Sequence, residues 1–377
     1  MKIIQADIQD FDDYLKTSQG KKETKNMLDV TSKIAKAFPK SKIKSMDIDE
    51  YVLGKNKNTF CHKLEYLKGS TSSIKGSNSF KFGIFFSDDN HKYRIKKCYP
   101  QIETKAFEII KDEIYDLIDM ADFNTLTQQQ KQRFYKIKLE PMVKSKILSV
   151  YNAKDHLPIN SDKDIKTFLS WFGVNPAKGT KFLDLQDLLI QQKNKDKIMA
   201  NWSLVEFSRF LYHKKNTQQA LAEMQLDEVN NFKSDEISKK DLKLFTDDAT
   251  KAPKKIIRDE TTSYVRDPRV VAKAIENANE QCELARTHKS FIKNNGSIYL
   301  EGHHLIPMRF ANEIYNKCKR NIDITANVVA LCSNCHNKIH YGKYRQNLVK
   351  KLYNLRNPKL QSNGINIKID DILSMYD

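Results

Sequence analysis

Apolar positions in the first third of the chain alternate between helical and strand-like spacing. Residues 27–38 and 104–123 carry apolar side chains three and four positions apart, which predicts two amphipathic helices. Between them, residues 80–86 have strand-like spacing, and a second short strand is expected at 93–96. The pattern predicts an α+β module over residues 1–125.

The next part of the chain shows only helical spacing, and it is followed by a change in pattern. Residues 216–260 lose the apolar period, and residues 233–255 are dense in charge, which predicts a linker with room for one short helix. Asp267-Pro268 then combines an N-cap residue with proline at the first helical position, and we place the last domain at residues 261–377. The expected fold class is multidomain α+β, with a helical domain at 126–215 built from segments 142–151, 161–172, 183–192 and 203–213.

The composition limits the kinds of binding partner and the cellular compartment that we expect for this protein. The chain has 65 Lys and Arg against 47 Asp and Glu, a net charge of +18, which favours nucleic acid over an anionic membrane surface. No apolar run approaches the roughly 20 residues of a spanning helix, and the first residues lack the apolar core of a secretory signal. We therefore expect a cytoplasmic protein without a membrane partner, whose six cysteines are reduced thiols or metal ligands.

Cysteine and histidine gather in the last quarter of the chain. Cys332 and Cys335 have the two-residue spacing that lets both thiolates bind one zinc ion. A tetrahedral site needs two further ligands, which Cys282 and His288 could supply. Cys318 competes for one of these places.

A second group of histidines suggests another metal site. His336 and His340 are four residues apart, so on a helix both imidazoles project from one face and can share a cation. Residues 298–305 have a strand pattern, which places His303 and His304 on opposite faces. One of the two can join the metal while its neighbour approaches the substrate.

The motifs in this region resemble a known nuclease family. Leu300-Glu-Gly-His-His-Leu-Ile-Pro307, Asn327-Val-Val-Ala-Leu-Cys-Ser-Asn-Cys-His336 and Ile339-His-Tyr-Gly342 resemble the HNH nucleases of the ββα-metal class. The resemblance covers about residues 262–377 and is strongest to the McrA-like branch, which carries a zinc knuckle. Many relatives pair the C-x2-C motif with a second one, whereas here Cys282 is followed three positions later by Ala285.

The resemblance implies a role for each residue of the site. His304 is expected to be the general base, and Asn327 to orient the hairpin that carries it. One divalent cation, such as Mg²⁺ or Mn²⁺, would be held by His303, His336 and His340, and a structural Zn²⁺ by Cys282, His288, Cys332 and Cys335.

Phosphodiester hydrolysis needs groups of these kinds. A neutral imidazole with a pKa near about 6.5 can activate a water molecule at neutral pH. A cation held by neutral histidines keeps its charge for the phosphoryl oxygens and the departing 3′ oxygen. Neighbouring phosphates could be bound by the basic residues on the flanks, namely Arg309, Lys317, Lys319, Arg320, Lys343 and Arg345.

The N-terminal two-thirds resemble known modules more weakly. Residues 46–86 are similar to N-terminal parts of restriction-type nucleases, and residues 144–172 to a helical segment found beside McrB-type modules. Basic residues interleaved with aromatic ones would suit a DNA-reading surface, and an ordinary half-buried sheet edged with lysines fits the same pattern. The positions concerned are Lys55, Lys57, Lys63, Lys68, Lys75, Phe80, Lys81, Phe82, Tyr93 and Arg94.

The sequence therefore favours a restriction or phage-defence endonuclease that acts on double-stranded DNA. The N-terminal domains would choose the site, either by cytosine modification or by sequence. The alternatives are a homing or structure-specific nuclease of a mobile element and a non-catalytic nucleic-acid-binding protein. Because one such site cuts one strand, and the two strands of a duplex are related by a two-fold axis, we expect a homodimer.

Overall fold

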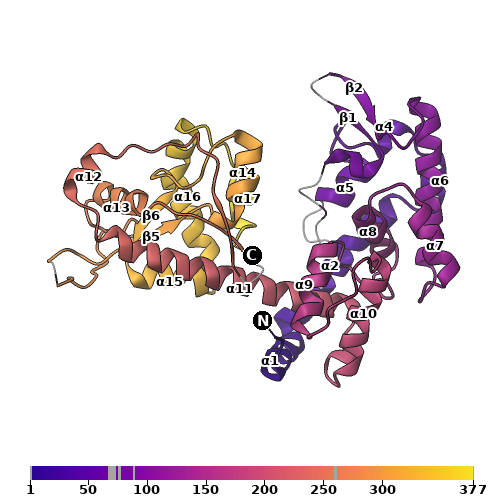
Figure 1. The fold of residues 1–377 in the computed structure, drawn as a ribbon, viewed down its shortest axis with the longest axis horizontal. Helices are drawn as coiled ribbons and strands as arrows, with labels where there is room; N and C mark the ends of the chain where they lie inside the picture. The colour runs from indigo at the N-terminus through magenta and orange to yellow at the C-terminus, as the bar shows by residue number, and fades with distance from the viewer. Residues whose placement is uncertain are drawn as a thin grey trace. The chain divides into compact units, whose positions relative to one another are not determined.

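The computed structural model describes residues 2–66, 74, 78–87, 90–258, 261–294 and 296–376. The chain divides into two compact units, residues 1–214 and 215–377, and the boundary lies inside helix α11 (Leu204–Ser234). Each unit is mainly helical and carries small antiparallel sheets (Figure 1), which confirms the multidomain α+β class. None of the helices in the described ranges is long and apolar enough to cross a membrane.

The first unit is a helical body with one β-hairpin, formed by strands β1 (Ile84–Ser87) and β2 (Lys92–Ile95). Its buried apolar side chains form one continuous core, to which residues on both sides of position 125 contribute. The predicted division of this part at 125/126 stays a prediction. The helices before α11 are α1 (Gln5–Lys16), α2 (Ser18–Ala37), α3 (Lys40–Ser45), α4 (Ile48–Tyr51), α5 (Phe60–Tyr66), α6 (Glu103–Ala121), α7 (Gln128–Lys136), α8 (Pro141–Tyr151), α9 (Asp162–Trp171) and α10 (Phe182–Lys195), with 3₁₀ turns η1 (Ser79–Phe82) and η2 (Met199–Asn201).

The strand expected at 80–86 begins later than its apolar pattern predicts. Residues 79–82 form the turn η1, and Gly83 follows with a φ of 81°. A side chain at this position would also meet Ile110, since an added Cβ would lie 2.8 Å from its Cδ1. Glycine is therefore required here, and strand β1 starts directly after it.

Lys81 and Phe82 are buried and so do not belong to a DNA-reading surface; for these two positions the structure agrees with the alternative of an ordinary half-buried sheet. Lys81 is 1% exposed; its Nζ donates to Glu65 Oε1 at 2.8 Å and to the Ile74 carbonyl at 2.8 Å. Phe82 is also buried. A lysine can be buried in this way because a carboxylate and a carbonyl satisfy its ammonium group. Lys68 and Lys75 lie outside the described residues.

The burial of Lys146 in α8 leads us to expect that the stability of the fold depends on pH. Burial lowers the pKa of its ammonium group from 10.5 to about 7. Between these two values the unfolded chain binds more protons at this residue than the folded chain, so the free energy of unfolding should rise with pH from about 7 to about 10. Replacing Lys146 by methionine should flatten this rise. Chemical unfolding of both proteins at several pH values measures the effect, and parallel pH profiles would contradict it.

The second unit places two small sheets among short helices. Strands β3 (Lys255–Arg258) and β4 (Thr261–Tyr264) form one antiparallel pair, and β5 (Glu301–His304) and β6 (Val328–Leu331) form the other. After α11, the helices are α12 (Lys239–Leu244), α13 (Pro268–Asn277), α14 (Ala311–Cys318), α15 (Ser333–Tyr341), α16 (Arg345–Ser362) and α17 (Ile369–Leu373), with the 3₁₀ turn η3 (Met308–Phe310).

The segment expected to be a charged linker, residues 216–260, contains regular structure. Helix α11 continues through it to Ser234, and α12 and β3 follow. Three polar residues of α11, Glu223, Asp227 and Asn231, are buried. The spacing of apolar residues does not predict this part of α11, because polar side chains make many of its contacts with the rest of the second unit.

Candidate active site

The candidate site is built on the β5–β6 hairpin and the helix that follows it. In the antiparallel register His303 lies opposite Val329 and His304 opposite Val328. Helices α13 and α15 both contact the two strands (Figure 1). The approach of α13 requires a glycine in β5, because a Cβ on Gly302 would lie 2.7 Å from a methyl group of Val271. Helix and hairpin together form a ββα arrangement.

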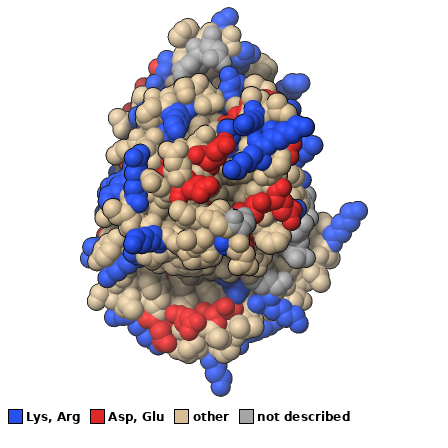
Figure 2. All heavy atoms as spheres, turned by 90° about the vertical axis from the view of Figure 1, so that its left-hand side faces the viewer, with Lys and Arg blue, Asp and Glu red and all other residues tan. Residues whose placement is uncertain are grey.

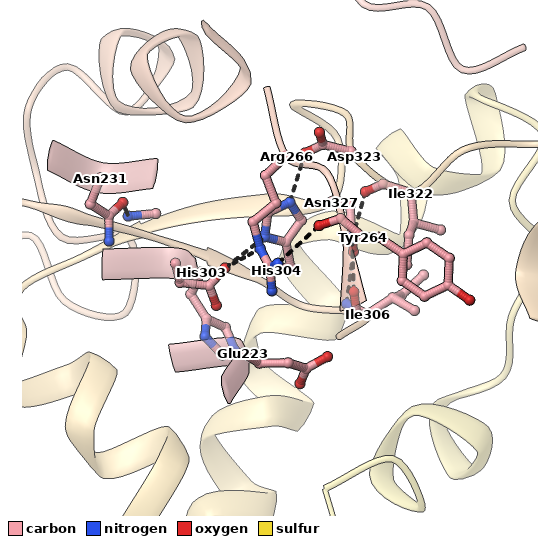
Figure 3. Close-up of polar contacts among 12 residues, drawn as sticks. Glu223, Asn231, Tyr264, Arg266, His303, His304, Ile306, Ile322, Asp323 and Asn327 are labelled. Atoms are coloured by element: carbon pink, nitrogen blue, oxygen red, sulfur yellow. Dashed lines mark hydrogen bonds and ion pairs between the residues drawn. The ribbon is translucent and has the colours of Figure 1, made fainter. Parts of the chain in front are cut away.

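Asn327 connects the end of β5 to the start of β6. Its amide oxygen accepts from Ile306 N at 2.8 Å, and its Nδ2 donates to the carbonyls of Ile306 at 3.0 Å and Ile322 at 2.9 Å (Figure 3). The side chain is completely buried. These are the contacts expected of a residue that orients the histidine-bearing strand.

Three histidines converge in the arrangement that the family resemblance implies. The candidate ligand atoms of His303, His336 and His340 lie within 4.8 Å of one another. His336 Nε2 and His340 Nε2 are 3.2 Å apart. Burial lowers the pKa of His303 well below its usual value and lowers that of His340 to about 4, with the neighbouring histidines adding to the effect. These two imidazoles are therefore neutral at pH 7 and have lone pairs for a cation.

Neighbouring groups orient two of these rings. His303 Nε2 lies 2.9 Å from the hydroxyl of Tyr376, which itself donates to the Leu305 carbonyl at 2.8 Å. A proton on Nε2 therefore satisfies Tyr376 and leaves Nδ1, a buried atom without a hydrogen-bond partner among the described residues, for a metal. In the same way, His336 Nδ1 contacts the carboxylate of Glu301 and leaves Nε2 for the metal. The donor set fits a divalent cation with open coordination positions.

His304 points away from this group, as the two-residue period of a strand requires. Its Nε2 lies 2.9 Å from Asp323 Oδ1 (Figure 3), and its Nδ1 is 3.7 Å from Asp227 Oδ1, too far for a hydrogen bond. Burial disfavours the charged ring, but the carboxylates of Asp227 and Asp323 outweigh it and raise the pKa of His304 to about 9. A general base must be neutral, and a cation bound beside it would oppose protonation through its charge.

Four further side chains form a second cluster. The ligand atoms of Cys282, His288, Cys332 and Cys335 also lie within 4.8 Å of one another, and His288 Nδ1 is 3.0 Å from Cys335 Sγ. Two thiolates and two further soft or borderline ligands are the donors that a structural zinc site needs. Cys318 is not part of this cluster; its thiol donates to the Ile314 carbonyl at 3.1 Å.

The predicted phosphate-binding residues differ in their exposure to solvent and in the contacts that their side chains already make. Lys319 and Lys343 are exposed, whereas Arg320 and Arg345 are half-buried and donate to backbone carbonyls. Arg309 is held by Glu223 of α11, with Nη1 to Oε2 at 2.7 Å. On the face drawn in Figure 2, basic side chains are spread among acidic ones, so charge alone does not mark a binding surface on that face.

Sequence reasoning missed the residues that surround the histidines. Asp323 precedes Asn327 by four positions and lies next to a motif, and Glu301 precedes His303 by two and lies inside one. Tyr376 and Asp227 are distant in sequence and have no local signal. Glu223, Asp227 and Asn231 do have a detectable period of four, which indicates one polar helix face.

Comparison with known proteins finds a protein that is similar to part of this chain. Over 90 residues, or 24% of this chain, the sequence is 39% identical to the "Type IV methyl-directed restriction enzyme EcoKMcrA" of Escherichia coli strain K12. The chain is related to a restriction endonuclease. The match spans 29% of that relative's length, well under two-thirds, so the relationship covers only part of either protein. No protein-family model matches the chain.

Proposed function

We propose that this chain is a metal-dependent endonuclease of the HNH type that hydrolyses double-stranded DNA in restriction or phage defence. The observation that carries the proposal is the convergence of His303, His336 and His340 beside His304, on two strands whose adjoining ends are hydrogen-bonded through Asn327 and on the helix that follows them. The partial relationship to a type IV restriction enzyme supports the restriction context.

Each residue has a defined task in the proposed reaction. His304 would take a proton from the attacking water through Nδ1, because Asp323 occupies its Nε2. The three other histidines would hold the cation, which supplies positive charge for the phosphoryl oxygens and the departing 3′ oxygen. Asn327 would keep His304 in place through the backbone and would not touch the substrate.

The donor set also favours certain metals. Imidazole nitrogens suit transition metals, whereas Mg²⁺ prefers oxygen ligands. We expect Mn²⁺, Co²⁺ or Ni²⁺ to support cleavage at lower concentration than Mg²⁺. The four-residue Cys/His cluster would hold Zn²⁺ in a structural role.

Substitution of a metal ligand should behave differently from substitution of the base. Replacing His336 by alanine removes one of three ligands, so cleavage should fall and should recover in part at high Mn²⁺. Replacing His304 should give a loss that no metal concentration restores. Titrating Mn²⁺ against the cleavage rate of both variants makes the comparison, and equal behaviour of the two would contradict the assigned roles.

Digestion of matched genomic DNA tests the proposed function and its site choice. Methylated and unmethylated preparations of the same DNA are incubated with the full chain and Mn²⁺ or Mg²⁺, and the cut ends are sequenced. Cuts only in methylated DNA would establish dependence on modification, and cuts in both at a common sequence would establish sequence recognition. Absence of cuts in both, with every divalent cation, would contradict the nuclease proposal.

Cleavage of both strands leads us to propose a homodimer on DNA. Each chain carries one such site, and two antiparallel strands are most simply served by two chains related by a two-fold axis. Light scattering with and without a short duplex should therefore show two chains on the DNA. A monomer that only nicks supercoiled plasmid would contradict the dimer.

A further inference from the structure

We propose that Arg266 and Arg309 form a subsite for DNA phosphates beside the catalytic histidines, and that carboxylates of α11 occupy this subsite in the DNA-free chain. The inference rests on the proposed nuclease function and adds to it a phosphate-binding pair and the segment that DNA must displace. Arg266 follows β4, and Arg309 lies in the turn η3.

One face of α11 carries the residues that occupy the subsite. Glu223, Asp227 and Asn231 are spaced four apart, so they lie in a row along the helix. All three are buried, and Asn231 accepts a hydrogen bond from the backbone of Gly302 at 2.8 Å, within the strand that carries the two histidines.

Both arginines are engaged by these carboxylates. Arg266 Nε contacts Asp227 Oδ1 at 2.6 Å. Arg309 donates to Glu223 twice, from its backbone N at 2.5 Å and from Nη1 at 2.7 Å. A guanidinium group binds carboxylates and phosphates through the same donor geometry, so these contacts are the kind that a DNA phosphate would make.

The position of Asp227 relative to His304 connects the subsite to the reaction. Asp323 is hydrogen-bonded to Nε2 of His304, and the carboxylate of Asp227 lies 3.7 Å from Nδ1, the other ring nitrogen. That second nitrogen is buried and has no hydrogen-bond partner among the described residues. The attacking water and the scissile phosphate must lie on this side, where Asp227 now lies. His303 and His304 are each only 3% exposed, and in this proposal the movement of α11 opens the side of His304 that faces Asp227 to a phosphodiester.

DNA binding by matched variants tests the subsite. We use the full chain with His304→Ala, which binds without cutting, and a fluorescent 30-base-pair duplex. Glu223→Gln is compared with Glu228→Gln, since Glu228 is an exposed residue of the same helix and both changes remove one negative charge. If Glu223 shields Arg309, its replacement should tighten binding at least about fivefold more than the control and steepen the slope of log K against log salt by about one phosphate contact. Equal effects would overturn the proposal.

Hydrogen exchange gives a second test that needs no change in α11. At saturating duplex, the amides of residues 215–234 and Gly302 should exchange faster than in the DNA-free chain, because α11 leaves the histidines. Slower or unchanged exchange would overturn the displacement. Failure of the wild-type chain to cut DNA would contradict the nuclease function alone, since the variant comparison and the exchange experiment measure binding. Thermal melts confirm that the variants are folded.

Discussion

Replacement of His304 by alanine should reduce the rate of DNA cleavage by about 10²–10⁴, the usual contribution of a general base. DNA affinity should change little, because His304 is 3% exposed and its proposed partner is the water molecule. Cleavage rates at saturating enzyme measure the first effect, and fluorescence anisotropy with a labelled duplex measures the second.

The control for this variant lies in the other unit. His62→Ala removes an imidazole from α5, outside the candidate site, and should cut at the wild-type rate. Near-normal cleavage by His304→Ala would refute the assignment of the base. A comparable loss in both variants would point to a general defect of the preparation and would equally remove the support for His304.

Replacement of Cys335 by serine should release zinc and unfold the second unit. Native domains are stable by about 5–15 kcal/mol, and zinc contributes about 10–16 kcal/mol to the folding of zinc-finger peptides, so loss of a ligand removes most of the stability. Elemental analysis should show less than one zinc per chain, and the thermal transition of the second unit should be lost.

Cys318→Ser is the matched control for the zinc site. Cys318 belongs to the same unit, but its thiol bonds to a backbone carbonyl and lies outside the Cys/His cluster. This variant should keep its zinc and its thermal midpoint. Loss of zinc from Cys318→Ser, with retention in Cys335→Ser, would reassign the ligands.

The sequence predicts those elements whose apolar residues face a core. Helix α6 shows this well: Ile110, Ile114 and Leu117 recur at helical spacing, and all three are buried against the rest of the first unit. The arrangement of the histidines could also be predicted from the sequence. His336 and His340 lie one turn apart on α15, and His303 and His304 point to opposite faces of β5. Local spacing determines these relationships, so no tertiary information is needed.

Elements held by polar contacts could not be predicted in this way. The second half of α11 attaches through Glu223, Asp227 and Asn231, polar residues that are typical of a solvated linker until their partners are known. Tyr376 could not be predicted either, because its contact with His303 joins residues 73 positions apart in the sequence. The sequence left both alternatives open for Lys81, because it does not show that Glu65 lies beside this residue.

End-group analysis of cleaved plasmid tests the central claim most directly. The purified full chain is incubated with supercoiled plasmid and Mn²⁺, with and without excess EDTA, and the termini are mapped by labelling. Metal-dependent hydrolysis with 3′ oxygen as the leaving group predicts nicked or linear DNA with 3′-hydroxyl and 5′-phosphate ends, and no product with EDTA. Products that persist in EDTA, or that carry 3′-phosphate ends, would contradict the account.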